Sequence, residues 1–491
     1  MRVAVVHGYF LHESGSGTYV RELTRELVRQ GHEVTLVCQE RSPEIYDFID
    51  SAHVLDDANA AAATVFERER LYAGSCRFVR PNLHGSLLVY VNGPFPGFAP
   101  EEVEPFQDTS ADRIEAYAIA NISAMRAVLA EWPVDLLLAN HALMQPWVVR
   151  WAAGEAIPYV VTVHGSEINF SLRRDARLAP YALDGLAGAA AVVAVSRASA
   201  DDLLDWAGGH GLDLVDKTEV VAPGIDPGIF APASSKAVAV DELRRDVVLP
   251  VGFDLGPSHD ILAFAGSLRW TKGVQHALAA VPLVAASRPN VRFLVAGDGP
   301  ARRDLEALVA ALQAGDLASA RRLTRTSDEL RTTHGYGPVV REGTAKPAGA
   351  RVAFLGQCTQ AQVARVFAAA DVSVAPSVFP EAIGLVTIEA LAAGSLALAS
   401  YHSGAASLAD ILAEELGDPA FRGLAPGGSF TGRLADLIVH GLSTYPTADP
   451  EFRARLHGLA VAHFPVWEQV ATRYLELGAT SDRRGAAPEK A

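Results

Sequence analysis

The residues best suited to chemistry lie in the stretch FPEAIGLVTIEALAAG, residues 379–394. It holds two carboxylates, Glu381 and Glu389, eight positions apart, and Gly384 stands between them where a helical pattern begins. An ionised carboxylate accepts hydrogen bonds from two donors, which suits the neighbouring hydroxyls of a ribose or a hexose. The stretch therefore predicts a site for a ligand with vicinal hydroxyls.

The predicted helix start adds hydrogen-bond donors to the two acids. N–H groups at a helix start have no partner within the helix, and three of them could face an anion or a hydroxyl: Ile383, Gly384 and Leu385. Further along, Glu389 falls between Ile388 and Leu391 in an otherwise apolar helix. Because burying an unpaired carboxylate costs several kcal/mol, we expect Glu389 to have a partner. From the residues alone, Glu381 could instead stabilise the helix start, and Glu389 could lie on a solvated helix face.

A second candidate loop is HESGSGTYVRELTREL, residues 12–27, between a predicted strand that ends at His7 and a helix that starts near Thr18. Gly15 and Gly17 would allow the backbone to come close to a ligand, and the helix N-terminus favours a phosphate. The pattern is neither GxGxxG nor a Walker loop. An ordinary strand-to-helix turn also uses Gly and Ser, so this reading stays open.

A third candidate loop is FAGSLRWTKGVQHAL, residues 264–278, which places Arg269 and Lys272 just before a predicted helix. Cations at a helix N-terminus are unfavourable for the helix dipole. A bound diphosphate would compensate for them. The alternative is a solvated loop with two ordinary charges.

Length and composition limit the class of protein. The chain has 491 residues, which is too many for one core and suits two domains of about 200 residues. Its formal charge of −15 argues against nucleic-acid binding and gives no indication of membrane contact. Three cysteines without CxxC spacing argue against a disulfide framework or a zinc site. No apolar run reaches the ~20 residues of a membrane span, and MRVAVVHGYF predicts the first buried strand of a cytoplasmic protein rather than a signal peptide.

Short apolar runs alternate with helical patterns along the chain, which predicts an α/β fold with parallel sheets. In the first half these runs are 3–7, 33–37, 135–140, 159–163, 191–195 and 219–223. After a stretch rich in Pro, Ala and Ser at 227–241, the theme restarts with 261–266, 291–297, 351–356, 371–376 and 396–400. We therefore predict two similar domains with a cleft between them as the ligand site.

The predicted domains are 1–230, with an insertion at about 41–130 that shows few strands, and 231–463, with an insertion at about 314–350. The second insertion carries several Arg and Lys residues, and either a surface loop or a basic flap near an anion would explain them. A C-terminal helix is expected at 464–480. The tail 481–491 is expected to be disordered.

At this point a family resemblance becomes clear. PEAIGLVTIEALAAG resembles the E-x7-E element of retaining glycosyltransferases with the GT-B fold, in particular family 4. Further segments match that family in the same order: SGSGTYVRELTRELVRQGHEVTLV, VVTVHGSE, AVSRAS, VVAPGID, FAGSLRWTKG, VAGDGP, VAFLG, ADVSVAPS and FPVWEQVATRYLEL. The resemblance spans nearly the whole chain except 41–130 and 314–350. It implies two Rossmann-like domains whose parallel sheets face a deep interdomain cleft, and a final helix that crosses back to the first domain.

The resemblance also implies roles for individual residues. Glu389 would hold the ribose hydroxyls of a nucleotide, and Glu381 would contact the transferred sugar together with the amides of residues 383–385. Lys272 would neutralise the diphosphate leaving group in place of a metal. Gly15 and Gly17 would approach the phosphate or the acceptor. His164, in HGSE, would lie beside the anomeric carbon, although a lone His after a strand is more often structural.

One departure from the family pattern concerns the phosphate site. Family members often carry Arg five residues before the Lys, where this chain has Ser267. Arg269 could reach the phosphates instead, or Ser267 could donate a single hydrogen bond. Loss of one charge-assisted contact to a leaving group costs about 1–3 kcal/mol, which would slow turnover without abolishing it.

The resemblance therefore predicts a cytoplasmic, metal-independent, retaining hexosyltransferase that needs no cofactor besides its nucleotide-sugar. UDP-sugar is the first expectation, followed by GDP- or ADP-sugar, and the acceptor would be a hydroxyl-bearing small molecule or glycan. Two alternatives remain: a GT-B fold sugar-nucleotide epimerase or phosphorylase, and a non-catalytic nucleotide-sugar-binding protein suggested by Ser267. The oligomeric state stays open.

Overall fold

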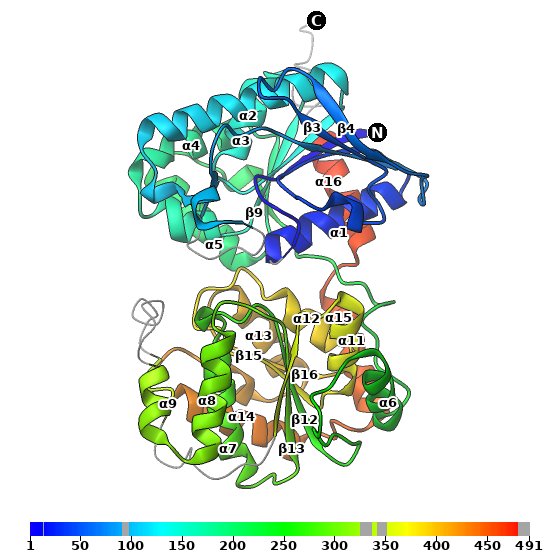
Figure 1. The fold of residues 1–491 in the computed structure, drawn as a ribbon, viewed down its shortest axis with the longest axis vertical. Coiled ribbons are helices and arrows are strands. Elements are labelled where there is room, and N and C mark those ends of the chain that lie inside the picture. Colours follow the sequence, from blue (N-terminus) through cyan, green and yellow to red (C-terminus); the bar gives the residue numbers. More distant parts are fainter. Residues whose placement is uncertain (13, 91–97, 325–335, 341–350, 480–491) are drawn as a thin grey trace, which may run out of the picture. The chain divides into compact units, whose positions relative to one another are not determined.

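The computed structural model describes residues 1–12, 14–90, 98–324, 336–340 and 351–479. The chain forms two compact units, Met1–Gly224 with Trp467–Ala491, and Ile225–Val466 (Figure 1). The tail expected to be disordered, 481–491, lies outside the described residues, and so does most of the basic insertion at 314–350. Within the described part, no helix is both long and apolar enough to cross a membrane.

Unit 1 is built on a nine-stranded sheet with the order β11-β10-β9-β8-β1-β2-β5-β3-β4. Neighbouring strands run parallel except for the antiparallel pair β3 and β4. All six strands predicted in the first half are confirmed, each with bounds within three residues of those predicted: β1 (Arg2–Val6), β2 (Glu33–Val37), β8 (Leu136–Asn140), β9 (Tyr159–Val163), β10 (Ala191–Ala194) and β11 (Thr218–Val220).

The expectation of few strands in residues 41–130 is wrong. Three strands of this segment extend the main sheet: β3 (Ser51–Leu55), β4 (Ala62–Glu67) and β5 (Ser75–Arg80). Two more form a small parallel pair, β6 (Leu87–Val89) and β7 (Val103–Pro105). β4 is largely exposed, and β3 and β5 mix polar with apolar side chains. Such strands lack the continuous apolar run that marks a strand covered on both faces.

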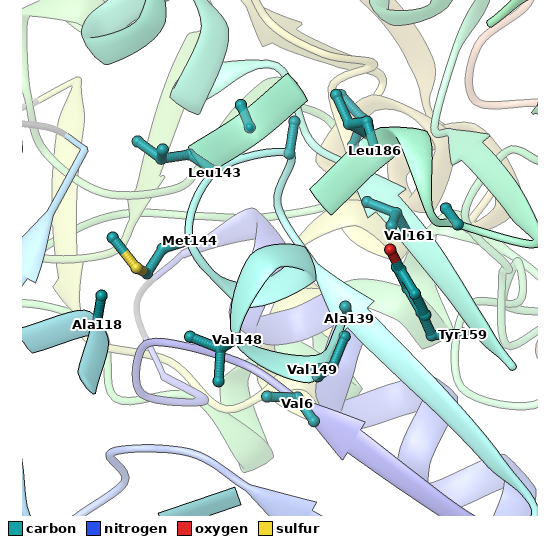
Figure 2. Packing of buried hydrophobic residues seen from close by; sticks show 14 of the residues in the cluster. Val6, Ala118, Ala139, Leu143, Met144, Val148, Val149, Tyr159, Val161 and Leu186 are labelled. Carbon is teal, nitrogen blue, oxygen red and sulfur yellow. The ribbon is translucent and has the colours of Figure 1, made fainter. Parts of the chain in front are cut away.

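The two faces of the unit 1 sheet are covered by different helices (Figure 1). Ala139 of β8 belongs to the same buried cluster as Val148 of α3 (Gln145–Ala153), and Figure 2 shows the packing of this cluster. That cluster also includes side chains of α2 (Ala111–Glu131) and α4 (Ala179–Ala187). Leu136 lies three residues before Ala139 on β8, and it faces Gly478 of α16 (Trp467–Ala479) instead. Because side chains alternate along a strand, the sheet is covered on both faces.

Helix α16 joins unit 1 through buried hydroxyls. Tyr474 lies between Tyr19 of α1 (Gly15–Arg29) and Thr162 of β9, with O···O distances of 3.0 Å and 2.8 Å. All three residues are buried. The last described helix is therefore part of the same core as the first strands.

Unit 2 carries a five-stranded parallel sheet with the order β14-β13-β12-β15-β16. The five strands predicted in the second half are confirmed: β12 (Asp260–Ala265), β13 (Val291–Ala296), β14 (Val352–Gly356), β15 (Val372–Ala375) and β16 (Leu396–Ala399). The helices that follow four of these strands are α7 (Val274–Ala285), α8 (Arg302–Ala314), α11 (Gln360–Ala369) and α12 (Leu385–Ala392). The chain order reverses between β12 and β15, which is where ligands bind in open α/β sheets.

The stretch at 227–241 interpreted as a boundary is only partly irregular. Helix α6 (Lys236–Asp246) begins inside it, and the Ser235 side chain accepts a hydrogen bond from the Val238 N–H. Lys236 donates to the buried Asp371 at 2.6 Å. The second part of this stretch therefore forms a helix, because an N-cap and a buried ion pair fix the start of α6.

We expect Tyr474→Phe to lower the free energy of unfolding of unit 1 by about 1–3 kcal/mol, because it leaves the buried Tyr19 and Thr162 hydroxyls without their shared partner. Urea unfolding followed by tryptophan fluorescence measures the effect. Tyr181→Phe is the control, since that hydroxyl has no hydrogen-bond partner among the described residues. Equal stability of the two variants would contradict the role given to Tyr474.

Candidate functional site

In unit 2, the loops after the adjacent strands β12 and β15 bring together two residues predicted from the sequence. The Lys272 ammonium donates to Glu381 Oε1 at 2.6 Å. The Ser377 hydroxyl donates to the same oxygen at 2.9 Å. Both loops follow the carboxyl ends of parallel strands, where functional side chains gather in this type of sheet.

The environment of Glu381 keeps its carboxylate ionised. Burial alone would raise the pKa of Glu381, but Lys272 and Ser377 outweigh it and lower the pKa below its ordinary value. The Lys272 side chain remains 39% exposed and that of Glu381 21% exposed. A charged pair that still reaches solvent can exchange its internal contact for a ligand, with the ammonium binding an anion and the carboxylate binding hydroxyls.

Close backbone contacts hold the two loops together. Gly273, next to Lys272, adopts a φ of 71°. A Cβ there would lie 1.7 Å from the Pro376 carbonyl oxygen, so only glycine fits. The Val378 N–H donates to the Thr271 carbonyl at 2.9 Å. The glycine thus lets the Lys272 loop approach the Glu381 loop closely.

The amides predicted to bind an anion lie at the start of α12, as expected. Gly384 adopts a φ of 77° and precedes the first helical residue, Leu385. Ile383, Gly384 and Leu385 are half-buried. Glu389 is also half-buried, between the buried Ile388 and Ala390.

Ser267 and Arg269 lie on the same loop as Lys272. The Arg269 N–H donates to the Ser267 carbonyl at 2.9 Å, and the short 3-10 turn Trp270–Lys272 follows. Both residues are half-buried. Their predicted phosphate contacts remain predictions.

His402 is a residue of this region that the sequence reasoning missed. Its Nε2 donates to the Ser377 carbonyl at 2.9 Å, so it supports the residue that contacts Glu381. Its ring packs edge-on against Tyr336 at 6.0 Å. His402 lies after β16. No local sequence pattern there predicts that it contacts the Glu381 loop.

In unit 1, the predicted glycine loop leads into α1. The Ser14 hydroxyl accepts a hydrogen bond from the Gly17 N–H at 2.9 Å and so caps the helix. A Cβ on Gly17 would lie 2.8 Å from the Phe10 carbonyl oxygen, whereas a Cβ on Gly15 would meet no atom within 4 Å. Gly17 is thus required by the loop itself, and Gly15 leaves open space beside the backbone.

His164 follows β9 and is held on both sides. Its Nε2 lies 3.1 Å from Asn140 Oδ1, and its backbone N–H donates to Glu167 Oε1 at 3.1 Å. Burial and the nearby His141 together lower the pKa of His164 to about 3, although Glu167 acts in the opposite direction. The imidazole is therefore neutral at physiological pH and can exchange hydrogen bonds with substrate but cannot act as a cation.

Glu167 is the second residue missed by sequence reasoning, although it belongs to the HGSE segment. It is completely buried. Burial alone would raise its pKa, yet His141, His164 and the Ala142 N–H bring the pKa down to about 2. Within the described ranges, no group of three or more His, Cys, Asp or Glu residues is arranged to hold a metal ion.

Comparison with protein families gives three separate matches. Residues 14–212 match the family described as "Glycosyl transferase 4-like domain". Residues 259–333 and 342–410 match two families described as "Glycosyl transferases group 1". The matches follow the order of the two units.

Comparison with individual proteins agrees with these matches. A D-inositol 3-phosphate glycosyltransferase of Segniliparus rotundus is 32% identical over 188 residues, which is 38% of this chain and 32% of that protein. The match thus spans about a third of the length of that relative. Sucrose-phosphate synthase from Thermosynechococcus elongatus shares the fold, with a TM-score of 0.65, 19% identity and coverage of 99% of this chain and 100% of that one.

A second similar structure is Anabaena HepE in complex with UDP and glucose, with a TM-score of 0.59 and 15% identity, and it covers 97% of this chain and 99% of that one. These structural likenesses extend over nearly the whole chain and concern the fold. The matched families show that this chain belongs to the glycosyltransferases of family 4 type, and the two parallel α/β units with the structural likenesses show the GT-B fold.

Proposed function

We propose that this protein transfers a hexose-type sugar from a nucleoside-diphosphate sugar to an acceptor hydroxyl, with retention of the anomeric configuration and without a metal. The contact between Lys272 and Glu381 is the observation that carries the proposal. An ammonium, which suits a diphosphate, lies beside a carboxylate, which suits sugar hydroxyls, at the edge of the sheet where the strand order reverses. This arrangement supports the proposal.

Different residues of unit 2 bind different parts of the donor. Lys272 neutralises the charge that develops on the leaving diphosphate, which is the part of the reaction that needs most electrostatic help. Glu381 accepts hydrogen bonds from the sugar, and the amides of residues 383–385 add donors at the start of α12. Glu389, one helical turn from Leu385, accepts the ribose hydroxyls.

UDP is the first candidate for the nucleotide of the donor. The supporting observation is the similarity to HepE, whose structure contains UDP and glucose. GDP and ADP are the next candidates. Backbone groups usually recognise the base of the nucleotide. The side chains of this chain therefore do not indicate which of the three nucleotides binds.

The acceptor side is built from unit 1. His164 is neutral and half-buried, and the backbone at Gly15 has open space beside it. These groups suit a hydroxyl-bearing small molecule or glycan. The name of the Segniliparus relative includes inositol 3-phosphate, a ligand with several ring hydroxyls, which is compatible with this class.

The reaction needs no paired catalytic carboxylates of the hydrolase type. The bond between the anomeric carbon and the phosphate oxygen breaks, and its electron pair stays on the diphosphate. The acceptor oxygen attacks the same face and forms the new glycosidic bond. The acceptor proton passes to the leaving phosphate oxygen, so no separate base is required.

One specific observation favours a second candidate function, a non-catalytic nucleotide-sugar-binding protein. Ser267 stands where the family often has Arg, so the site has one cation fewer for the diphosphate. Turnover of any donor would exclude this second candidate.

Among UDP, GDP, ADP, dTDP and CDP, we expect one diphosphate, UDP first, to stabilise the wild type. At 100 times its dissociation constant it adds about 2.7 kcal/mol, which a thermal shift assay detects. Glu389→Ala removes charge-assisted hydrogen bonds and should weaken that nucleotide roughly tenfold to a hundredfold. Glu414→Ala is the control, because that side chain is 74% exposed on α13 (Ala406–Glu415). Equal shifts in both variants would contradict ribose binding by Glu389.

Lys272→Met should weaken UDP binding about tenfold or more and leave uridine binding unchanged, because only UDP carries the charge that Lys272 neutralises. Isothermal titration of both ligands to wild type and variant measures the difference. Equal weakening of UDP and uridine would show that Lys272 shapes the site without binding phosphate.

With an α-linked nucleotide-sugar donor, we expect an α-linked product and an unchanged rate in the presence of a chelator. Proton NMR of the anomeric signal reports the product, and a coupled assay for the released nucleotide reports the rate. A β-linked product would overturn retention. A rate lost with the chelator and restored by Mg²⁺ would overturn metal independence.

A further inference from the structure

The carboxylate of Glu167 connects two loops of unit 1. Its Oε1 accepts hydrogen bonds from the N–H groups of Ala142 at 3.0 Å and His164 at 3.1 Å. Its Oε2 accepts from His141 Nδ1 at 3.2 Å and from the Ser166 hydroxyl at 3.4 Å. Since Glu167 is completely buried, these contacts replace water as its hydrogen-bond donors.

The contact with Glu167 fixes the proton of His141 on one ring nitrogen. An ionised carboxylate only accepts, so Nδ1 of His141 carries the hydrogen. The other nitrogen, Nε2, is buried and has no hydrogen-bond partner in the described part of the chain. The backbone of His141 adopts a φ of 70°, which is unfavourable for a residue with a side chain. Glu167 thus holds a strained residue in place.

His141 in turn packs against the ring of His164, with ring centroids 4.8 Å apart. The proton of His164 is fixed separately, by Asn140. The amide nitrogen of Asn140 faces the Val6 carbonyl at 3.4 Å, so its oxygen faces His164 and accepts from Nε2. A neutral imidazole with its hydrogen on Nε2 has one remaining polar atom, Nδ1, which only accepts hydrogen bonds.

We propose that Glu167 is a positioning residue that holds His164 so that its Nδ1 accepts a hydrogen bond from a substrate hydroxyl. Glu167 acts on the backbone of His164 directly and on its ring through His141. This inference rests on the proposed transferase function. It concerns residues of unit 1 only and is independent of how Lys272 and Glu381 bind the donor.

The proposal explains why a carboxylate is needed where an amide of the same shape would fit. In Glu167→Gln, the single oxygen must serve the N–H groups of Ala142 and His164, so the NH₂ group faces His141 Nδ1. Two donors cannot bond to each other, so His141 must move its hydrogen to Nε2 or turn its ring. The first change leaves a buried N–H without an acceptor, and the second disturbs the packing against His164.

The test combines kinetics with imidazole NMR on the full-length chain. In wild type labelled with ¹⁵N-histidine, at about pH 8, above the ordinary imidazole pKa, we expect the hydrogen of His141 on Nδ1 and that of His164 on Nε2. Signals are assigned with His141→Gln and His164→Gln. In Glu167→Gln we expect the His141 hydrogen to move to Nε2 and kcat to fall about tenfold to a hundredfold, with nucleotide affinity unchanged.

Asp50→Asn is the matched control. Asp50 is a buried acid of unit 1 that accepts from the Cys76 N–H at 2.7 Å, near the start of β5 and so at the opposite edge of the sheet. It should change neither the histidine signals nor kcat. Glu167→Asp keeps the charge and should retain the Nδ1 hydrogen of His141 with an intermediate kcat. It also replaces Glu167→Gln should that variant fail to fold.

The outcomes separate this inference from the proposed function. If the wild type turns over a donor and Glu167→Gln keeps its kcat despite a moved hydrogen, the positioning role is overturned. If the histidine signals of Glu167→Gln and Glu167→Asp both match wild type, it is overturned as well. If wild type turns over no donor, the transferase proposal fails, and the NMR result alone still decides whether Glu167 sets the state of His141.

Discussion

A carboxylate that is wholly or partly removed from water must be given other hydrogen-bond donors, and in each unit the candidate residues gather around one such group. In unit 1, Glu167 draws its donors from the loops after β8 and β9, which are neighbours in the sheet. In unit 2, Glu381 connects the loops after β12 and β15, which are also neighbours. Each acid therefore fixes the edge of a parallel sheet by joining segments far apart in the sequence.

The central strands of both sheets could be predicted because burial on both faces leaves a continuous apolar run, such as YVVTV of β9 or ILAFA of β12. The strands β3, β4 and β5 could not. β4 is mostly exposed and lies at the end of the sheet. Because few of its side chains are buried, its sequence lacks the apolar run that would indicate a strand. The extent of a sheet beyond its core is thus set by tertiary pairing more than by local pattern.

For the candidate sites, residue types were predictable and their contacts were not. Lys272 and Glu381 each stood out within their own loop, yet 109 positions separate them and no local pattern shows that they meet. Glu167 was visible in HGSE, but its sequence neighbours do not reveal that it is buried, because its donors come from the loop after β8. His402 carries still less signal, since its hydrogen bond goes to the backbone of Ser377.

The distance between Lys272 and Glu381 is set by the backbone rather than by their own side chains. A Cβ at Gly273 would lie 1.7 Å from the Pro376 oxygen, and one at Gly404 would lie 1.7 Å from the Ala382 oxygen. Gly273 belongs to the Lys272 loop, and Gly404 belongs to the loop after β16. Both glycines let neighbouring backbone pack closely against the Glu381 loop. Ser267, five residues before Lys272, lies outside these close contacts. Ser267 therefore leaves this loop with one cation fewer than the family pattern, without changing the backbone contacts that bring Lys272 and Glu381 together.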